Sequence, residues 1–202
     1  MKKRELTKLK IQETAIGLFL KKGIDQTSVD EIVTKSGVAK GTFFYHYKQK
    51  DILIEEIITN EFDGYFSIPE VIVNDQSLNA AEKMSRVLSA VFVSLKSPSS
   101  IEKMFIHGVP VQFQLLMNEI RLEKMIPIIR SILIQGNVEG CFRVQHVQTA
   151  ASVVTRGISA HIHAVYAHFS QPEILLNTLA GIEELVNNVT KTSKSICIEI
   201  NL

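Results

Sequence analysis

The sequence has few cysteines and no long apolar run. Its 202 residues include two cysteines, Cys141 and Cys197, which stand far apart and form no CxxC pair. This spacing indicates neither a disulfide framework nor a zinc site, so we expect incidental thiols in a reducing compartment. No apolar stretch reaches the roughly 18 residues that a membrane-spanning helix needs, and no apolar signal region follows the charged N-terminus. A cytoplasmic protein is therefore expected.

The sequence also lacks the arrangements that mark an enzyme. We find no paired carboxylates, no Ser/His/Asp order and no glycine loop that would cradle a phosphate. His161, His163 and His168 suggest a metal site, but their separations of 2, 5 and 7 residues miss the spacing of four that puts two ligands on one helical face. The sequence therefore predicts no catalytic residue, no metal site and no cofactor.

The charge is nearly balanced overall but is unevenly distributed. The net charge is +1, and 46% of the residues are hydrophobic, which is ample for a packed core. Residues 1–50 carry 11 Lys and Arg against 5 Asp and Glu, whereas residues 51–202 carry 11 against 16. A basic excess confined to one part of a chain is typical of a nucleic-acid-binding segment. We therefore expect two domains, 1–50 and 51–202.

Two short helices and a sharp turn are predicted between residues 27 and 47. Thr27 or Ser28 can cap the first helix, because a hydroxyl can accept from an amide one turn into the helix, and Glu31 stands three residues after Ser28 as a capping box requires. Ile32 lies on the apolar face of this first helix, and Gly37 ends it with a residue that tolerates a positive φ. A second helix then spans residues 39–46.

The second helix has an unusual composition, because residues 43–47 read FFYHY. Successive positions of a helix turn by about 100°, so these rings cannot all point inward. Phe43 is the ring that we expect to face the first helix. Gly41 would let the helix approach another surface closely, and two lysines, Lys48 and Lys50, follow. Basic, small and aromatic side chains on one short helix suit a DNA groove.

The segment SGVAKGTFFYHY at 36–47 resembles the DNA-binding domain of the TetR/AcrR family of bacterial transcriptional regulators. The resemblance covers about the first quarter of the chain. It departs from the family pattern at Phe44, where tyrosine is most common, so a thymine-methyl or packing role replaces a hydroxyl contact. The supporting positions are Ile11, Ala15, Leu18, Phe19, Gly23, Thr27, Ile32, Lys50, Asp51 and Leu53. The DNA contacts that the resemblance implies are Thr27, Ser28, Lys40, Gly41, Thr42, Phe44, Tyr45, His46 and Lys50.

The rest of the chain shows helical periodicity and no strand pattern. Pro127 is expected to kink its helix, and Gly136 and Gly140 are expected to be turn glycines. The fold class is therefore all-α, with a three-helix N-terminal helix-turn-helix domain and a larger C-terminal helical domain. The predicted helices are 51 to between 64 and 69, 78–96, 101–107, 111–135, 147–169 and 172–190, with a loop at 67–77.

The larger domain is expected to bind an effector and to dimerise. Its soft and aromatic side chains are typical of a core, but some of them can line an apolar pocket. The last two helices are expected to dock on a second copy as a four-helix bundle. The resemblance implies a homodimeric repressor that leaves a near-palindromic DNA operator when it binds a small apolar molecule; the alternative is a helical metal-binding protein or a protein-interaction module. The predicted ligand-binding residues are Phe92, Phe105, His107, Phe113, Met117, Arg121 and His161.

Overall fold

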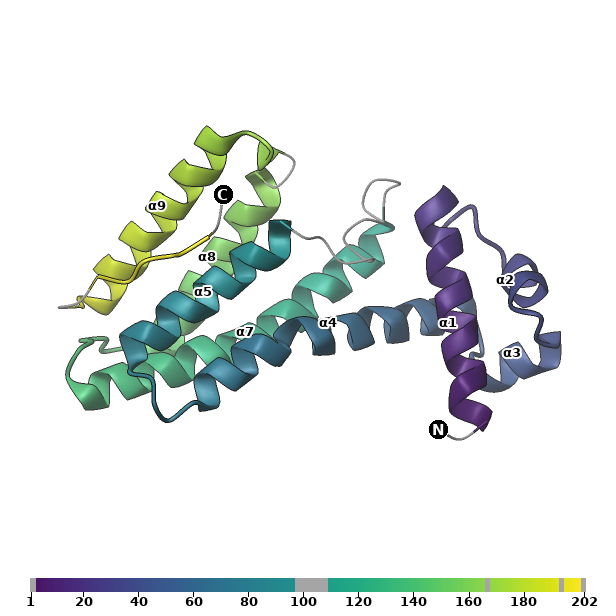
Figure 1. The fold of residues 1–202 in the computed structure, drawn as a ribbon, viewed down its shortest axis with the longest axis horizontal. Coiled ribbons are helices and arrows are strands. Elements are labelled where there is room, and N and C mark those ends of the chain that lie inside the picture. Colours follow the sequence, from purple (N-terminus) through teal and green to yellow (C-terminus); the bar gives the residue numbers. More distant parts are fainter. Residues whose placement is uncertain (1–2, 97–108, 166–167, 193–194, 201–202) are drawn as a thin grey trace. The chain divides into compact units, whose positions relative to one another are not determined.

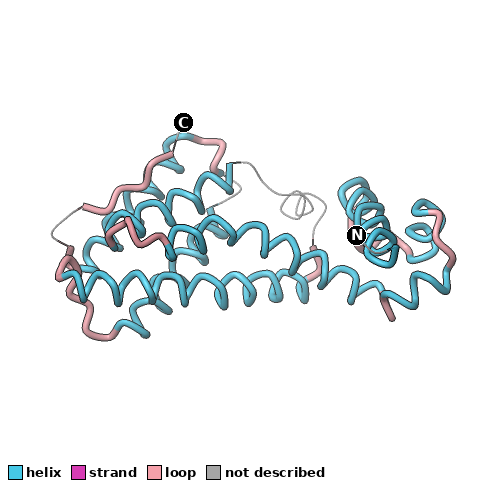
Figure 2. The backbone as a smooth tube through the Cα atoms, turned by 60° about the horizontal axis from the view of Figure 1, so that its bottom comes forward, coloured by secondary structure: helices cyan, strands magenta, loops and turns pink. Residues whose placement is uncertain are grey.

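The computed structural model describes residues 3–96, 109–165, 168–192 and 195–200. Their regular secondary structure is helical throughout (Figures 1 and 2), which confirms the predicted all-α class. None of the described helices is long and apolar enough to cross a membrane. The helices are α1 (Lys3–Lys22), α2 (Val29–Ser36), α3 (Lys40–His46), α4 (Lys50–Asn74), α5 (Ala80–Lys96), α7 (Val111–Glu139), α8 (Val147–Val165) and α9 (Pro172–Thr190).

The chain forms two compact units. The first comprises Met1–Tyr65 and Ser97–Ile120, and the second comprises Phe66–Lys96 and Arg121–Leu202. Helices α4 and α7 therefore each contribute to both units. The division into domains at 1–50 and 51–202 stays a prediction.

The first unit is built around the apolar stripe of α1. Ile11, Ala15 and Phe19 are fully buried, and Leu18 is nearly so. Helices α2 and α3 follow α1, and α1 packs against α2 (Figure 1). Helices α2 and α3, with eight and seven residues, are too short to be stable alone, so their stability comes from this shared core.

The second unit begins with the last part of α4, where the predicted loop at 67–77 is wrong. Helix α4 continues through Pro69 and ends at Asn74. Phe62, Phe66 and Pro69 follow the 4, 3 spacing of one helical face, and all three are buried. Burial of that face outweighs the single hydrogen bond that a proline removes.

The predicted end of the next long helix is also wrong. Helix α7 does not stop at Gln135 but continues to Glu139, so Gly136 lies inside the helix and is not a turn glycine. A Cβ atom on Gly136 would lie 2.0 Å from a ring carbon of Phe142. The glycine is there because the chain folds back over this position: Gly140, at φ 74°, makes the turn, and the amide of Phe142 donates to the carbonyl of Gly136 at 3.0 Å.

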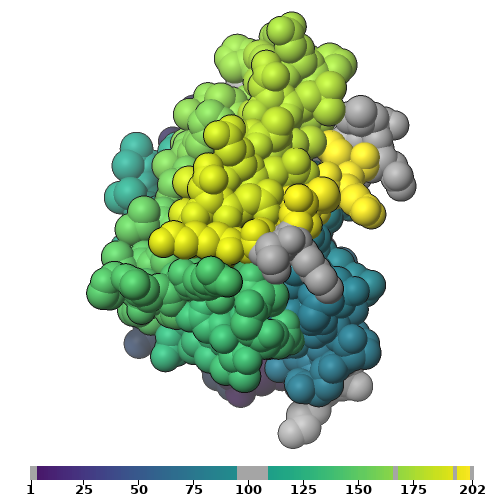
Figure 3. All heavy atoms as spheres, turned by 90° about the vertical axis from the view of Figure 1, so that its left-hand side faces the viewer, coloured from purple at the N-terminus to yellow at the C-terminus, as the bar shows by residue number. Residues whose placement is uncertain are grey.

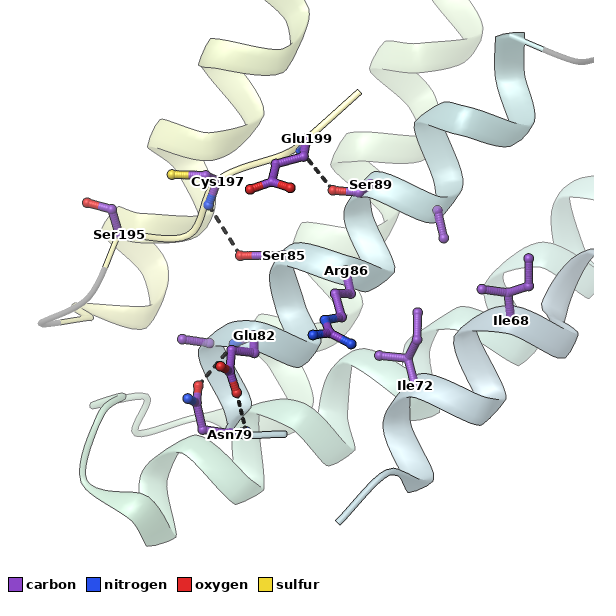
Figure 4. A pocket seen from close by; sticks show the side chains of 12 residues that line it. Ile68, Ile72, Asn79, Glu82, Ser85, Arg86, Ser89, Ser195, Cys197 and Glu199 are labelled. Carbon is purple, nitrogen blue, oxygen red and sulfur yellow. Dashed lines mark hydrogen bonds between the residues drawn. The ribbon is translucent and has the colours of Figure 1, made fainter. Parts of the chain in front are cut away.

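The remaining helices match their predictions more closely. Helix α9 spans Pro172–Thr190 as expected, and it packs against α8, which ends at Val165 rather than at Phe169. The helix predicted at 101–107 lies outside the described residues. Helix α5 starts with a reciprocal capping box that the sequence analysis missed: Asn79 accepts from the amide of Glu82, and Glu82 accepts from the amide of Asn79 (Figure 4).

The C-terminal residues 195–200 are extended and lie beside α9 (Figure 3). Alternate amides of this segment donate to side chains of α5 on one side (Figure 4) and of α9 on the other. On each helix the accepting side chains are four residues apart, which is about 6 Å along the helix axis. Every second residue of the extended segment advances about 6.6 Å, so its amides stay level with these side chains. The pairs are Cys197 to Ser85 at 3.3 Å, Glu199 to Ser89 at 2.9 Å, Ile196 to Asn187 at 2.8 Å and Ile198 to Glu183 at 2.5 Å.

Candidate DNA-binding surface

Helix α2 is capped as its sequence predicted. The hydroxyl of Ser28 accepts from the amide of Glu31 at 3.2 Å. Gly37 ends the helix in the left-handed region at φ 64°. Lys22 and Lys35 both contact the carboxylate of Glu31, and the hydrogen bond from Lys22 is the main reason why the pKa of Glu31 lies below its usual value. The turn at Gly37 sets where α3 begins.

Two of the predicted DNA contacts, Thr27 and Lys50, donate hydrogen bonds to backbone carbonyls at the corner before α2. Thr27 is buried, and its hydroxyl donates to the carbonyl of Gly23 at 2.9 Å. The ammonium of Lys50 donates to the carbonyls of Ile24 at 2.9 Å and Thr27 at 3.0 Å. The Thr27 hydroxyl therefore points inward and two of the three Lys50 protons are already used, so we do not include the Thr27 side chain in the proposed interface.

Helix α3 separates its aromatic rings into two groups. Phe43 and Tyr47 are fully buried, whereas Phe44 is 44% exposed and Tyr45 is 68% exposed. The Phe43 ring lies 5.5 Å from that of Phe44 and 5.8 Å from that of Tyr47, measured between centroids. The expectation that some rings face outward is confirmed. Because the inner rings anchor α3, the outer rings are presented on a fixed support.

The outward side of α3 forms one continuous surface. Lys40, Gly41, Phe44 and Tyr45 occupy positions i, i+1, i+4 and i+5, which share a helical face, and all four are exposed. We call these four residues the α3 face. No atom lies within 4 Å of the position that a Cβ of Gly41 would take. Thr42 and His46 are half-buried at its edge.

Two charged residues that the predicted contact set did not include border the α3 face. The guanidinium carbon of Arg4, on α1, lies 5.3 Å from the centroid of the Tyr45 ring, a cation–π distance. The carboxylate of Asp30, on α2, lies 2.6 Å from the ammonium of Lys40. The basic N-terminus was a usable signal for Arg4, whereas pairing between α2 and α3 requires the tertiary structure.

The pKa of His46 lies below its ordinary value, mainly because the ring is partly desolvated. The positive charges of Arg4 and Lys8 act in the same direction, and the carboxylate of Glu56 opposes them. His46 is therefore mostly neutral at pH 7, and a nearby negative charge would favour its protonation.

A polar cluster behind this surface ties α1 to α4. Gln12 donates to one carboxylate oxygen of Glu56 at 2.8 Å, and the ammonium of Lys8 lies 2.6 Å from the other. Lys8 also lies 5.8 Å from the centroid of the Tyr47 ring. Burial raises the pKa of the Tyr47 phenol well above its usual value, so this ring stays neutral. The cluster positions α1, and with it Arg4.

The predicted effector-binding residues divide between the two units. Phe113 and Met117 are buried in the first unit, where the space beside Met117 is only about 10 Å³. Phe92 is buried in the second unit, Arg121 is half-buried there, and His161 is exposed. Phe105 and His107 lie outside the described residues. The effector pocket stays a prediction.

The second unit contains an open groove of about 770 Å³ between α4, α5 and the C-terminal segment (Figure 4). Ile68 and Ile72 contribute apolar side chains to its lining, and Arg86 contributes a positive charge beside two acidic residues, Glu82 and Glu199. None of the predicted ligand residues lines it. In the part of the chain that the structure describes, no group of three or more His, Cys, Asp or Glu side chains could hold a metal ion.

Comparison with known proteins points to one family. The family model "Bacterial regulatory proteins, tetR family" matches residues 11–57, which contain α2 and α3. The HTH-type transcriptional regulator YvdT of Bacillus subtilis is 26% identical over 46% of this chain and 55% of its own length. The chain spans about half, or less, of the length of the curated relatives that it matches.

Solved structures show the same fold over most of the chain. SmeT, the repressor of the Stenotrophomonas maltophilia multidrug efflux pump SmeDEF, aligns with a TM-score of 0.69 and 14% identity over 90% of this chain and 89% of its own. The Bacillus subtilis transcriptional regulator FadR, in complex with stearoyl-CoA, aligns with a TM-score of 0.63 and 19% identity over 90% of this chain and 97% of its own. At these identities the likeness extends to the fold alone.

Proposed function

We propose that the chain, whose residues 11–57 match the model of the tetR family of bacterial regulatory proteins, represses transcription by binding an operator through the α3 face. The observation that carries this proposal is the exposed α3 face itself, which joins Lys40, Gly41, Phe44 and Tyr45 on a helix anchored by two buried rings. Its lysine supplies a donor to bases or phosphates, its glycine permits close approach, and its rings offer apolar contact to thymine methyl groups.

A homodimer would place two such faces on one duplex. Recognition helices of a symmetric dimer enter successive major grooves, so the operator would be a near-palindrome with half-sites about one helical turn, or a multiple of it, apart. We assign the dimer contact to α8 and α9, whose exposed apolar side chains include Val153, Leu176 and Leu185. The SmeT and FadR folds support a regulator with this architecture.

Release from the operator would follow from binding of a small apolar ligand in the larger domain. FadR was solved with stearoyl-CoA, which supports an apolar effector class for a chain of this fold. A ligand lowers DNA affinity only as far as it binds the non-DNA-binding conformation more tightly than the DNA-binding one. A tenfold loss of operator affinity therefore requires a differential of about 1.4 kcal/mol in ligand binding.

Substitution of Tyr45 by alanine tests the proposed interface. We expect the variant to bind the operator about 10- to 30-fold more weakly, because one ring and its hydroxyl are lost from the α3 face. The ring is 68% exposed, so the free energy of unfolding should change little. Fluorescence anisotropy with a duplex selected by the unaltered chain from a randomised pool measures the affinity.

The matched control is Val138→Ala. Val138 is 83% exposed on α7, in the second unit, and its truncation should leave operator affinity unchanged. Equal affinities of the Tyr45 variant and the unaltered chain for the selected duplex would exclude the α3 face as the reading surface.

Operator affinity is expected to rise as the pH falls from 7.5 toward 6. The pKa of His46 in the free protein lies below its ordinary value, and DNA phosphates that favour the imidazolium would raise it on binding. Binding then takes up part of a proton, and a reaction that takes up protons is favoured at lower pH. Anisotropy titrations across this range, repeated with His46→Gln, measure the effect. A pH profile that survives in the glutamine variant would assign the dependence to another group.

A further inference from the structure

We propose that Asp30 is a specificity-determining residue that restrains Lys40 and weakens binding to DNA of unrelated sequence. The inference rests on the proposed operator-reading function and concerns the same surface. Asp30 and Lys40 come from different helices, the first turn of α2 and the first residue of α3. Their carboxylate oxygen and ammonium nitrogen lie 2.6 Å apart.

Helix stability does not account for this pair. Side chains that are 60% and 71% exposed gain little from an ion pair in water. A cation in the first turn also opposes the helix dipole, and α3 has no side-chain hydrogen bond at its N-cap, Ala39. Lys40 thus stands where local stability disfavours it, at the edge of the α3 face.

The pairing leaves Lys40 partly available and held in one place. An ammonium has three protons, and one of them is directed at the Asp30 carboxylate, so two remain for acceptors on a base edge. The neighbouring acid on α2, Glu31, is contacted by Lys22 and Lys35. Asp30 is therefore the acid of α2 that acts on Lys40.

Asp30 affects the two modes of DNA binding differently. In binding to unrelated sequences, affinity comes from phosphates, and an exposed carboxylate beside the α3 face repels them while holding back a lysine that would otherwise reach them. On the operator, the restrained Lys40 gains acceptors on base edges that offset this repulsion. A repulsive element that penalises the wrong partner more than the right one increases specificity.

The test compares Asp30→Asn with Asp25→Asn. Asp25 is exposed in the loop before α2, and its replacement changes the net charge equally without touching the ion pair of Lys40. Affinities of the full-length proteins for the selected duplex and for a shuffled duplex of equal composition are measured at several salt concentrations. For Asp30→Asn, we expect tighter binding to the shuffled duplex, a salt slope steeper by about 0.9 and a specificity ratio that falls about tenfold.

Lys40→Met separates the restraint of the lysine from simple charge removal. In this background Asp30→Asn should no longer steepen the salt slope, because no lysine is released. Equal effects of the Asp25 and Asp30 variants, or an unchanged specificity ratio in Asp30→Asn, would overturn the proposal. If the unaltered chain itself fails to distinguish the two duplexes, the proposed function fails; if it distinguishes them and Asp30→Asn does so equally well, only this inference fails.

Discussion

Replacement of Phe43 by alanine is expected to lower the free energy of unfolding by about 3–5 kcal/mol, the range for truncating a buried phenylalanine. Phe43 is fully buried, and its ring centroid lies 5.8 Å from that of Tyr47. Helix α3 has only seven residues, so it depends on this anchor for its conformation. DNA binding should be lost together with the packing of α3.

Phe44→Ala provides the matched control for this prediction. The chemical change is the same, but the Phe44 ring is 44% exposed on the α3 face. Its truncation should cost less than about 1 kcal/mol of stability while weakening DNA binding. Guanidinium denaturation followed by circular dichroism measures both variants. Similar losses of stability at the two positions would show that Phe43 is not the anchor of α3.

Gly136→Ala is expected to destabilise the protein by about 2–3 kcal/mol, although alanine is normally the better helix former by about 1 kcal/mol. The added Cβ would lie 2.0 Å from one ring carbon of Phe142 and 2.5 Å from another. Phe142 is 2% exposed, and its amide is bonded to the carbonyl of Gly136, so neither the ring nor the backbone can move aside without loss of packing.

The control for this prediction is Gly17→Ala in α1, where no atom lies within 4 Å of the new Cβ. This substitution should raise the free energy of unfolding by up to about 1 kcal/mol. Opposite signs in denaturant titrations of the two variants are the expected result. A gain in stability at Gly136 would mean that Phe142 does not pack over α7 at this position.

The local features of residues 27–47 were predictable because their causes lie close together in the sequence. The Ser28 cap depends on a residue three positions away, and the turn at Gly37 depends on the φ freedom of one residue. The outward rings of α3 followed from helical geometry alone. The resemblance to the TetR/AcrR family rests on the same segment, which lies within the residues 11–57 that match the family model.

Features that depend on distant contacts were not predictable. Pro69 was predicted to lie in a loop, but α4 continues through it because Phe66 and Pro69 are buried in the second unit. Gly136 was predicted to be a turn glycine from its sequence neighbourhood. Its packing role depends on the ring of Phe142, which lies where a Cβ atom of residue 136 would be. The DNA contact of Lys50 stays a prediction, but the hydrogen bonds of its ammonium to carbonyls 23 and 26 residues away could not be read from the sequence.

The measurement that tests the central claim most directly is the ratio of the affinities of the unaltered chain for its selected duplex and for the shuffled duplex, determined by anisotropy at several salt concentrations. The account predicts a ratio of about 10³ or more and affinities that fall steeply with salt. Failure of the pool to yield a preferred sequence would contradict the claim that the α3 face reads DNA. Equal affinity for the selected and shuffled duplexes at every salt concentration would contradict it as well.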